Sequence, residues 1–173
     1  MPAVTIFFLK TADPYGDFSN FSKHGFELDG LYWPTSEHYY QAMKTLSTED
    51  SEIIRTAETP RQAKNLGMKV NLRADWEDVV GDEKLHAMFM DDRGCVVESV
   101  KDHFMLSALT AKFTQNEELK ALLVGTGEAT LVEDFPKDSY WANGPDRNGL
   151  NKLGRMLMFL RKRIQDGVLD GQQ

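Results

Sequence analysis

The chain has 173 residues, 41% of them hydrophobic and 10% aromatic, which suits one domain with its own core and excludes general disorder. Its 27 acidic and 20 basic residues give a formal net charge of −7, which argues against tight nonspecific binding to duplex nucleic acid. The single cysteine, Cys95, excludes an intramolecular disulfide, and no apolar stretch approaches the ~20 residues of a membrane span. We therefore expect a cytoplasmic protein with no membrane partner.

The first half of the chain predicts a strand, a hairpin and three helices. Residues 4–9 are β-branched and aromatic, as in strands, and Asp29-Gly30 between two apolar arms predicts a two-residue hairpin turn. Pro34–Glu37 has helix-start residues, with Thr35 or Ser36 as the cap. The expected helices cover roughly 35–46, 49–57 and 59–67.

In the second half, apolar residues recur at helical spacing from 82 to 113, with a break at 92–94. We further expect a helix over 116–123, a strand over 129–132 and a helix over 150–164. The prediction is a mainly α (α+β) fold, with one helical domain over 1–165, a small antiparallel β-sheet, and a loose tail over 166–173.

Polar residues gather on one side of the helix that starts near Pro34. Glu37, Gln41 and Lys44 fall within about 40° of one another, opposite the apolar face. Glu37 and Lys44 are separated by roughly 10 Å along the helix axis. Periodicity alone favours an ordinary solvated stripe of spaced polar pairs. A catalytic face is the alternative.

The loop 138–149 combines aromatics, amides, carboxylates and glycines just before a helix. Free N–H groups at a helix start are a natural place for a phosphate, and glycine allows close approach to a ligand. A surface loop with Trp141 folded onto the core is an equal alternative. The four histidines lack metal-ligand spacing, and no nucleotide-binding glycine motif is present. We therefore expect no metal and no cofactor.

Both segments belong to a longer ordered pattern. Its most characteristic stretch is Trp33–Lys44, which reads WPTSEHYYQAMK. The remaining pieces, in order, are Phe18–Phe21, Thr59-Pro60, 63–67, Arg73, Trp76, Lys112-Phe113, Gln115-Asn116, Leu119, 122–123, 131–133, Asp138, Tyr140-Trp141, Gly144, Asp146, Gly149, Asn151, 153–154, 157–158 and Arg161. In order and spacing the chain resembles the NADAR (YbiA-like) family over roughly 7–163.

Three features depart from that family's usual pattern. Ala142 stands where members usually have glycine, and Arg147 follows Asp146 where they often have glycine. The segment 82–95 is longer than usual. These departures lie near the expected pocket or its rim, so they bear on the substrate more than on the reaction.

The resemblance implies a mainly helical fold and an N-glycosidase that hydrolyses a ribose C1′–N bond. Two substrate classes are associated with the family: ADP-ribose attached to a base, notably guanine in DNA, and phosphoribosylamine intermediates of riboflavin biosynthesis. We favour the first, because the chain is one stand-alone domain and Arg147 adds a cation to the expected phosphate loop. A non-catalytic module that binds ADP-ribose is the alternative, but it would need neither Glu37 nor Lys44.

Cleavage of a C1′–N bond builds positive charge at the anomeric carbon, which a carboxylate stabilises, and it needs an acid. A lysine can also attack the opened sugar to form a Schiff base. The resemblance makes Glu37, Lys44, Glu133 and Asp138 the expected catalytic residues. The expected substrate-binding residues are Ser19, Asn20, Phe21, Trp33, Tyr40, Gln41, Arg73, Trp141, Asn143, Gly144, Asp146, Arg147 and Asn151. Among them, Arg73 and the 144–149 loop suit phosphate.

Overall fold

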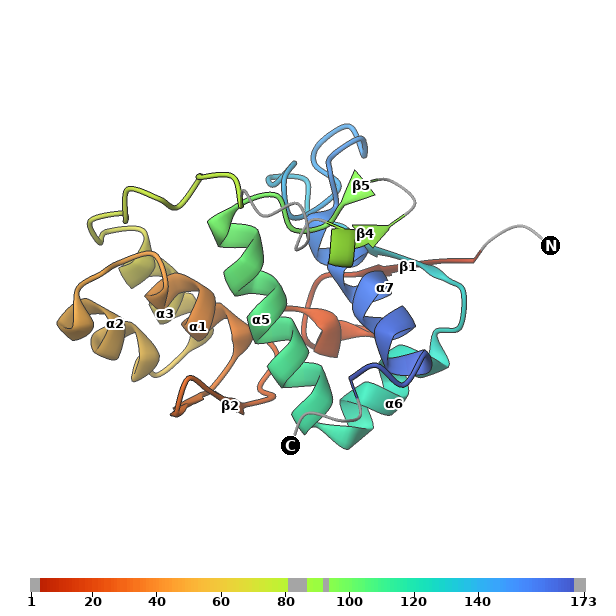
Figure 1. Cartoon of the computed structure of the whole chain (residues 1–173), viewed down its shortest axis with the longest axis horizontal. Coiled ribbons are helices and arrows are strands. Elements are labelled where there is room, and N and C mark those ends of the chain that lie inside the picture. The colour runs from red at the N-terminus through yellow and green to blue at the C-terminus, as the bar shows by residue number, and fades with distance from the viewer. Residues whose placement is uncertain (1–3, 81–86, 92–93, 170–173) are drawn as a thin grey trace. The chain divides into compact units, whose positions relative to one another are not determined.

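The structure is a computed structural model that describes residues 4–80, 87–91 and 94–169. Its helices are α1 Ser36–Ala42, α2 Thr48–Arg55, α3 Pro60–Gly67, α5 Val100–Gln115, α6 Glu117–Gly125 and α7 Lys152–Gln165, with a short 3-10 helix η1 at Gly16–Phe18 (Figure 1). Its strands are β1 Thr5–Phe8, β2 Phe26–Leu28, β3 Leu31–Trp33, β4 Met90–Asp91, β5 Gly94–Cys95 and β6 Thr130–Glu133. The predicted α+β class is confirmed.

The chain divides into two compact units. Unit 1 combines Met1–Ser19 with Phe113–Gln173, and unit 2 is Asn20–Lys112. Each unit has its own secondary structure and its own buried side chains, so each is described by itself.

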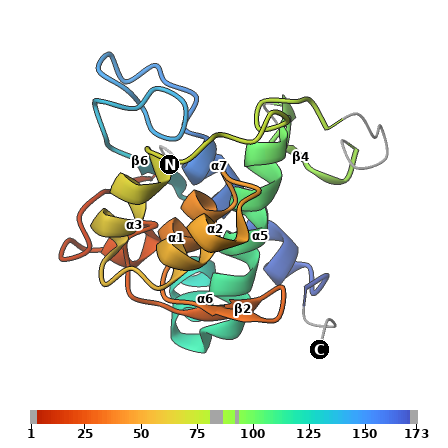
Figure 2. The same ribbon diagram turned by 90° about the vertical axis from the view of Figure 1, so that its left-hand side faces the viewer.

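Unit 2 begins with the predicted hairpin. β2 and β3 pair antiparallel, and the turn residues Asp29 and Gly30 have φ of 56° and 76°, the positive values that Asp-Gly turns supply. α1, α2 and α3 then lie side by side (Figure 2). Each helix is capped at its start by a hydroxyl side chain that accepts a hydrogen bond from a backbone N–H of the first turn. The capping residues are Thr35, Ser47 and Thr59.

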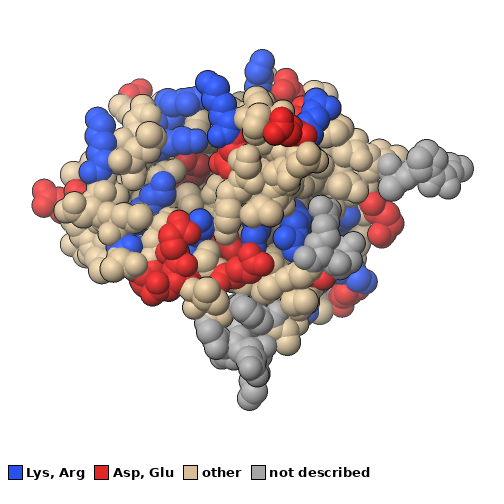
Figure 3. All heavy atoms as spheres, turned by 90° about the horizontal axis from the view of Figure 1, so that it is seen from above, with Lys and Arg blue, Asp and Glu red and all other residues tan. Residues whose placement is uncertain are grey.

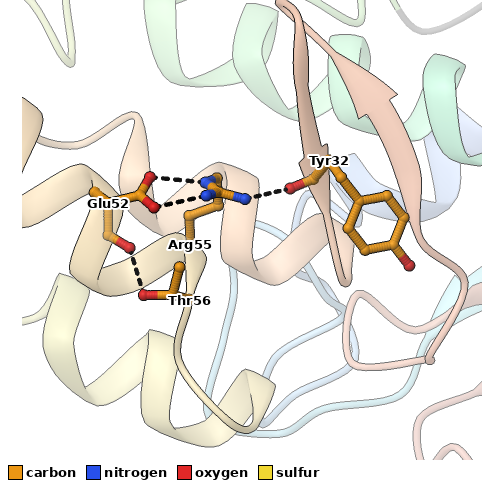
Figure 4. A network of polar contacts seen from close by, with 4 residues as sticks. All are labelled: Tyr32, Glu52, Arg55 and Thr56. Carbon is orange, nitrogen blue, oxygen red and sulfur yellow. Dashed lines mark hydrogen bonds and ion pairs between the residues drawn. The ribbon is translucent and has the colours of Figure 1, made fainter.

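An aromatic core holds these helices to the hairpin. The ring of Trp33 packs edge-on against Tyr39 at 5.0 Å between centroids, and its indole N–H donates to the carbonyl of Leu28. At the surface, Arg55 makes a bidentate pair with Glu52 and also donates to the carbonyl of Tyr32 (Figure 4). This side chain therefore ties α2 to β3.

Unit 1 is built on a parallel pair of strands. β1 pairs with β6 in the register Thr5–Thr130 to Phe8–Glu133, and α7 packs against β6. Phe8 at the end of β1 packs against Phe18 of η1, with ring centroids 5.7 Å apart, which holds η1 to the strand.

Two expectations about strands and helices were wrong. Within the described residues, the sheets are three separate pairs, and β1–β6 is parallel, so they do not form one antiparallel sheet. Met90–Asp91 of β4 and Gly94–Cys95 of β5 pair antiparallel, and helix α5 begins only at Val100; residues 82–86 and 92–93 of the expected helix lie outside the described residues. Helical spacing of apolar residues cannot distinguish a helix from a short hairpin that buries Cys95 and Val96.

Other boundaries agree to within a few residues. α6 and α7 match the expected helices, and β6 matches the expected strand shifted by one residue. Of the expected tail, residues 170–173 lie outside the described part, and the single-domain interpretation stays a prediction. None of the helices searched in the described residues is both long and apolar enough to cross a bilayer.

Candidate active site

Glu37 is a buried carboxyl group, with only 5% of its surface exposed. It lies in the first turn of α1, where its backbone N–H donates to the carbonyl of Asn20 at 3.1 Å. The Asn20 amide oxygen accepts a bond from the Ser36 hydroxyl at 2.8 Å, and its nitrogen lies 3.5 Å from the sulfur of Met105. Asn20 therefore anchors the start of α1 and fixes the backbone that carries Glu37.

Gln41 lies one turn further along the same face of α1. Its Nε2 donates to Glu37 Oε1 at 2.8 Å, and the side chain is 3% exposed. Its Oε1 is buried without a hydrogen-bond partner among the described residues. A buried acceptor without a hydrogen bond costs free energy, so it often marks a place where a ligand or water supplies the donor.

Lys44 lies just beyond the helix rather than on it, which corrects the expectation of one helical face over 35–46. α1 ends at Ala42, and Lys44 N–H donates to the Gln41 carbonyl in a tighter turn. The Lys44 ammonium lies 5.4 Å from the ring centroid of Tyr40. Tyr40 in turn packs on Trp76, so the ring under Lys44 is held in place.

Arg73 fixes the backbone at this turn. Its N–H donates to the Lys44 carbonyl at 2.8 Å, and its guanidinium donates to the Met43 carbonyl at 3.5 Å. The same guanidinium pairs with Asp75 through two bonds and lies 5.0 Å from the ring centroid of Phe104. Arg73 thus caps the end of α1 and is already paired with a carboxylate.

Burial shifts the titration of both expected catalytic groups of unit 2. Desolvation raises the pKa of Glu37 above its ordinary value, against the opposing effect of Gln41 and of the cations Lys64, Lys44 and Arg61. Desolvation also lowers the pKa of Lys44, assisted by the positive charge of Lys64 and opposed by Glu37. The arrangement favours a protonated acid and a neutral amine, the forms that acid and nucleophilic catalysis require.

Two cations were missed by the sequence analysis. Arg61 and Lys64 lie one turn apart on α3, 5.3 Å and 5.9 Å from the ring centroid of the half-buried Phe21, and both act on the charge of Glu37. Acidic and basic side chains are mixed over the face in Figure 3, so overall charge does not reveal this local excess. The only sequence signal was the three-residue spacing of two basic residues, which is common on solvated helices.

Trp33 is part of the hydrophobic core of unit 2. It is 1% exposed and packs with Tyr39, Phe26 and Ile54. Its indole N–H is already donated to Leu28. Trp33 therefore supports α1 from the hydrophobic core, and its contact with a substrate stays a prediction.

The loop of unit 1 is held by its own polar groups. Asp138 accepts bonds from the N–H groups of Tyr140 and Trp141, both at 2.8 Å, which closes a tight turn. The half-buried Trp141 packs edge-on against Tyr140 at 5.1 Å. Glu133 is half-buried at the end of β6, and its backbone carbonyl accepts from Asn143 N–H.

The start of α7 is less available to a phosphate than the sequence suggested. The N–H groups of Lys152 and Leu153 donate to the carbonyls of Tyr140 and Trp141, because the loop folds back along the helix start. Asn151, at φ 49°, accepts from Glu133 N–H and donates to the Leu131 carbonyl, so its amide joins α7 to β6. The expectation of free N–H groups at this helix start was therefore wrong for Lys152 and Leu153.

A pocket of about 210 Å³ nevertheless lies within this loop, lined by Ser139, Asn143, Pro145, Asp146, Asn148, Gly149 and Leu150. The Asn143 amide donates to Asp134 at 2.6 Å, and its Oδ1 is buried without a partner among the described residues. The exposed Arg147 lies 3.5 Å from Asp134 and stacks over the ring of Phe7. Gly144, at φ 70°, packs against Ser139, where any side chain would collide.

The remaining predicted residue is Ser19, which is buried at the end of unit 1. Unit 2 therefore brings together Asn20, Phe21, Tyr40, Glu37, Gln41 and Lys44. Unit 1 brings together Glu133, Asp138, Trp141, Asn143, Gly144, Asp146, Arg147 and Asn151. The convergence of the two sets on one substrate stays a prediction.

Comparison with known proteins places this arrangement in a family. The model of the NADAR domain matches residues 6–165. The chain belongs to the NADAR domain family. It is 40% identical over 166 residues to the N-glycosidase YbiA of Escherichia coli K12, covering 95% of this chain and 91% of that protein. The NMR structure of the E. coli protein YbiA matches with a TM-score of 0.79 and 38% identity, covering 100% of this chain and 92% of that one.

Two further relatives bear on activity. The N-glycosidase Npun_R5314 of Nostoc punctiforme is 38% identical, with 94% of each chain covered. The riboflavin biosynthesis protein PYRR of Zea mays, named as chloroplastic, is 34% identical over 92% of this chain, which matches 25% of that longer protein. The names of the similar-length relatives support the predicted class, a hydrolase acting on N-glycosyl bonds.

Proposed function

We propose that this protein hydrolyses a ribose C1′–N bond, using Glu37 as the acid and Lys44 as the nucleophile. The observation that carries the proposal is a buried carboxyl group, bonded to Gln41, within the electrostatic influence of a half-buried lysine. A module that only binds a nucleotide gains nothing from burying this acid, because burial of a charged group costs stability.

The proposed reaction runs in four steps. Glu37 protonates the ribose ring oxygen, and the ring opens as C1′ forms a double bond to the nitrogen of the base. The neutral Lys44 amine adds to C1′, and a proton passes to the departing nitrogen. The base leaves as a free amine while a C1′–Lys44 Schiff base forms. Water then adds to C1′, which releases the sugar as an aldehyde and restores the Lys44 amine.

The carboxylates of unit 1 have a supporting role in this proposal. Glu133 or Asp138 stabilises charge or moves a proton in the later steps, because one carboxyl group cannot serve every step equally well. Asp138 already uses one oxygen to hold its turn, which leaves its second oxygen for this role.

For the substrate we propose ADP-ribose attached to guanine in DNA, in keeping with Arg147 as an added cation in the loop of unit 1 and with the cytoplasmic location expected from the sequence. A second candidate is a phosphoribosylamine intermediate of riboflavin biosynthesis. It is favoured by relatives named for that process, the maize protein and one from Vibrio vulnificus that is 31% identical over 93% of this chain.

A side-by-side turnover assay tests the proposal. Purified protein is given guanine-ADP-ribosylated DNA and the diaminopyrimidinone ribosylamine phosphate, and release of the base amine is followed by mass spectrometry. We expect turnover of the DNA substrate by the wild type and a loss of at least ~10²-fold in Lys44→Arg. Turnover of the riboflavin intermediate alone would reverse the choice of substrate, and turnover of neither would favour the non-catalytic module.

A further inference from the structure

We propose that Arg61 and Lys64 form a binding site for the 5′-phosphoryl group of the substrate ribose, next to Glu37. This proposal rests on the proposed function, because it identifies the group that orients the reacting sugar. It follows from the arrangement of charges on α3 and around Phe21.

The two cations, the exposed Arg61 and the half-buried Lys64, share one aromatic neighbour. Both lie over the same half-buried Phe21 ring, at 5.3 Å for Arg61 and 5.9 Å for Lys64. Neither side chain has an ion pair or hydrogen bond within the described part of the chain, in contrast to Arg55 and Arg73, which each pair with a carboxylate. Two positive side chains close to one ring repel each other, and an anion bound by both would offset that repulsion.

The local charge also has the sign that a phosphate requires. Three cations, Arg61, Lys64 and Lys44, act on the single carboxyl group of Glu37, in a chain whose formal net charge is −7. An excess of positive charge in an acidic protein needs an explanation beyond solubility. Since both proposed substrates carry a phosphoryl group on ribose, the same site serves either.

The sequence suggested Arg73 as a phosphate-binding residue, but Arg73 already has an ion pair, whereas Arg61 and Lys64 have none among the described residues. The guanidinium of Arg73 is bound by Asp75 and by the end of α1, so a phosphate would have to displace existing bonds. Arg61 and Lys64 can bind a phosphate without breaking a hydrogen bond or ion pair to another described residue, and α3 packs directly on α1, which carries Glu37.

The test measures binding separately from turnover. Isothermal titration compares ribose 5-phosphate, ADP-ribose and ribose as ligands of the wild type, Arg61→Gln, Lys64→Gln and the double variant. Lys69→Gln is the matched control, because it removes one exposed lysine of the same unit that does not lie over Phe21. Arg61→Lys tests whether charge alone is sufficient.

Each single glutamine variant should weaken binding of both phosphorylated ligands about tenfold, and the double variant about 10²-fold, the scale of lost charge-assisted bonds. Binding of ribose and the behaviour of Lys69→Gln should not change. In turnover, the double variant should raise KM while kcat changes far less.

Unchanged binding of ribose 5-phosphate by the double variant would overturn this site, even if the enzyme is active. Equal losses for ribose and ribose 5-phosphate would overturn it as well. A charge-dependent loss of ribose 5-phosphate binding in a protein that turns over neither substrate would keep the site and remove the proposed function.

Discussion

The α1–α3 cluster of unit 2 and the loop 138–150 of unit 1 are both dense in polar residues, but they use them differently. In the loop, Asp138 and Asn151 are bonded to neighbouring backbone groups, and Asn143 bonds Asp134, although its Oδ1 has no partner among the described residues. In the cluster, Lys44 and Lys64 have no ion pair among the described residues, and the Glu37 carboxyl group is bonded to Gln41. Polar density alone therefore does not identify a site; charged groups without an ion pair are the more informative observation.

The largest effect is expected for Glu37→Gln, which keeps the shape and the bond from Gln41 but removes the acid. Turnover should fall by roughly 10²–10⁴-fold, the scale of a lost general acid. Glu49→Gln, at an exposed position in α2, is the matched control and should retain full turnover. Wild-type rates in Glu37→Gln would place the chemistry elsewhere in the molecule.

The same variant separates function from stability. The pKa of Glu37 in the folded protein lies above its ordinary value of 4.5, so its favourable contribution is complete below that pH and is lost as the pH rises through the folded pKa. At neutral pH its ionisation therefore opposes folding. Glu37→Gln should have an equal or higher Tm at neutral pH, and a large fall in Tm would mean that the carboxylate is a structural partner.

The pH dependence of kcat/KM follows from the two shifts. Activity should fall as the pH rises through the pKa of Glu37, which is raised above 4.5, because the acid must be protonated. Activity should increase as the pH rises through the pKa of Lys44, which is lowered below 10.5, because the amine must be neutral. A bell-shaped profile with both limbs between these values is expected. A flat profile across that range would contradict these roles.

An intermediate effect is expected for Gly67→Ala, which tests how closely α3 must approach α1. A Cβ at this position would lie 2.2 Å from Gln41 Oε1 and 2.8 Å from Gln41 Cβ, so Gln41 must move away from Glu37. Turnover should fall about tenfold, and the free energy of unfolding should drop by ~1–3 kcal/mol, as in other overpacked sites.

Gly125→Ala is the matched control for that change. Gly125 is also helical, but nothing lies within 4 Å of an added Cβ, so alanine should be neutral or slightly stabilising. Equal behaviour of the two variants would show that the Gly67 contact has no part in positioning Gln41.

A smaller effect is expected in unit 1. Asp138→Asn keeps the oxygen that closes the turn and removes only the charge, and Glu133→Gln does the same at the end of β6. At least one of the two should lose roughly tenfold or more in turnover, at or somewhat below the scale of a full acid–base residue. Full turnover in both would restrict catalysis to unit 2.

The smallest effect is expected for Arg147→Gln. Its contact with Asp134 is 3.5 Å long, and its side chain is 69% exposed, so the free energy of unfolding should change by less than about 0.5 kcal/mol. If Arg147 helps to hold a diphosphate, KM should rise a few-fold for ADP-ribosylated DNA and not for the riboflavin intermediate. Equal KM values in wild type and variant would remove Arg147 from the substrate site.

The sequence predicted those parts of the fold that depend on local chemistry. The cap at Thr35, the helix start at 59–60 and the turn at Asp29-Gly30 depend on neighbouring residues, and all were found as expected. The hairpin around Cys95 and the early end of α1 were not predicted, because local spacing carries no information about tertiary contacts such as those of Arg73 with the turn at Lys44.

The candidate site likewise contains residues that the sequence could predict and residues that depend on tertiary packing. Glu37, Gln41 and Lys44 could be predicted as site residues because they are close in sequence and stand in a family-like stretch. Arg61 and Lys64 influence the charge of Glu37 because α3 packs on α1, a packing that Gly67 permits. No spacing within 61–67 predicts that influence.

Reductive trapping shows whether Lys44 bonds covalently to the sugar during turnover. Borohydride is added during turnover, and the protein is digested and analysed by mass spectrometry, with Lys44→Arg as the variant that keeps the positive charge but cannot form a Schiff base. We expect a ribosyl adduct on Lys44 in the wild type, none in the variant, and a loss of at least ~10²-fold in the variant's turnover. An unmodified Lys44, together with an active Lys44→Arg enzyme, would contradict this expectation and leave the lysine as a purely electrostatic residue.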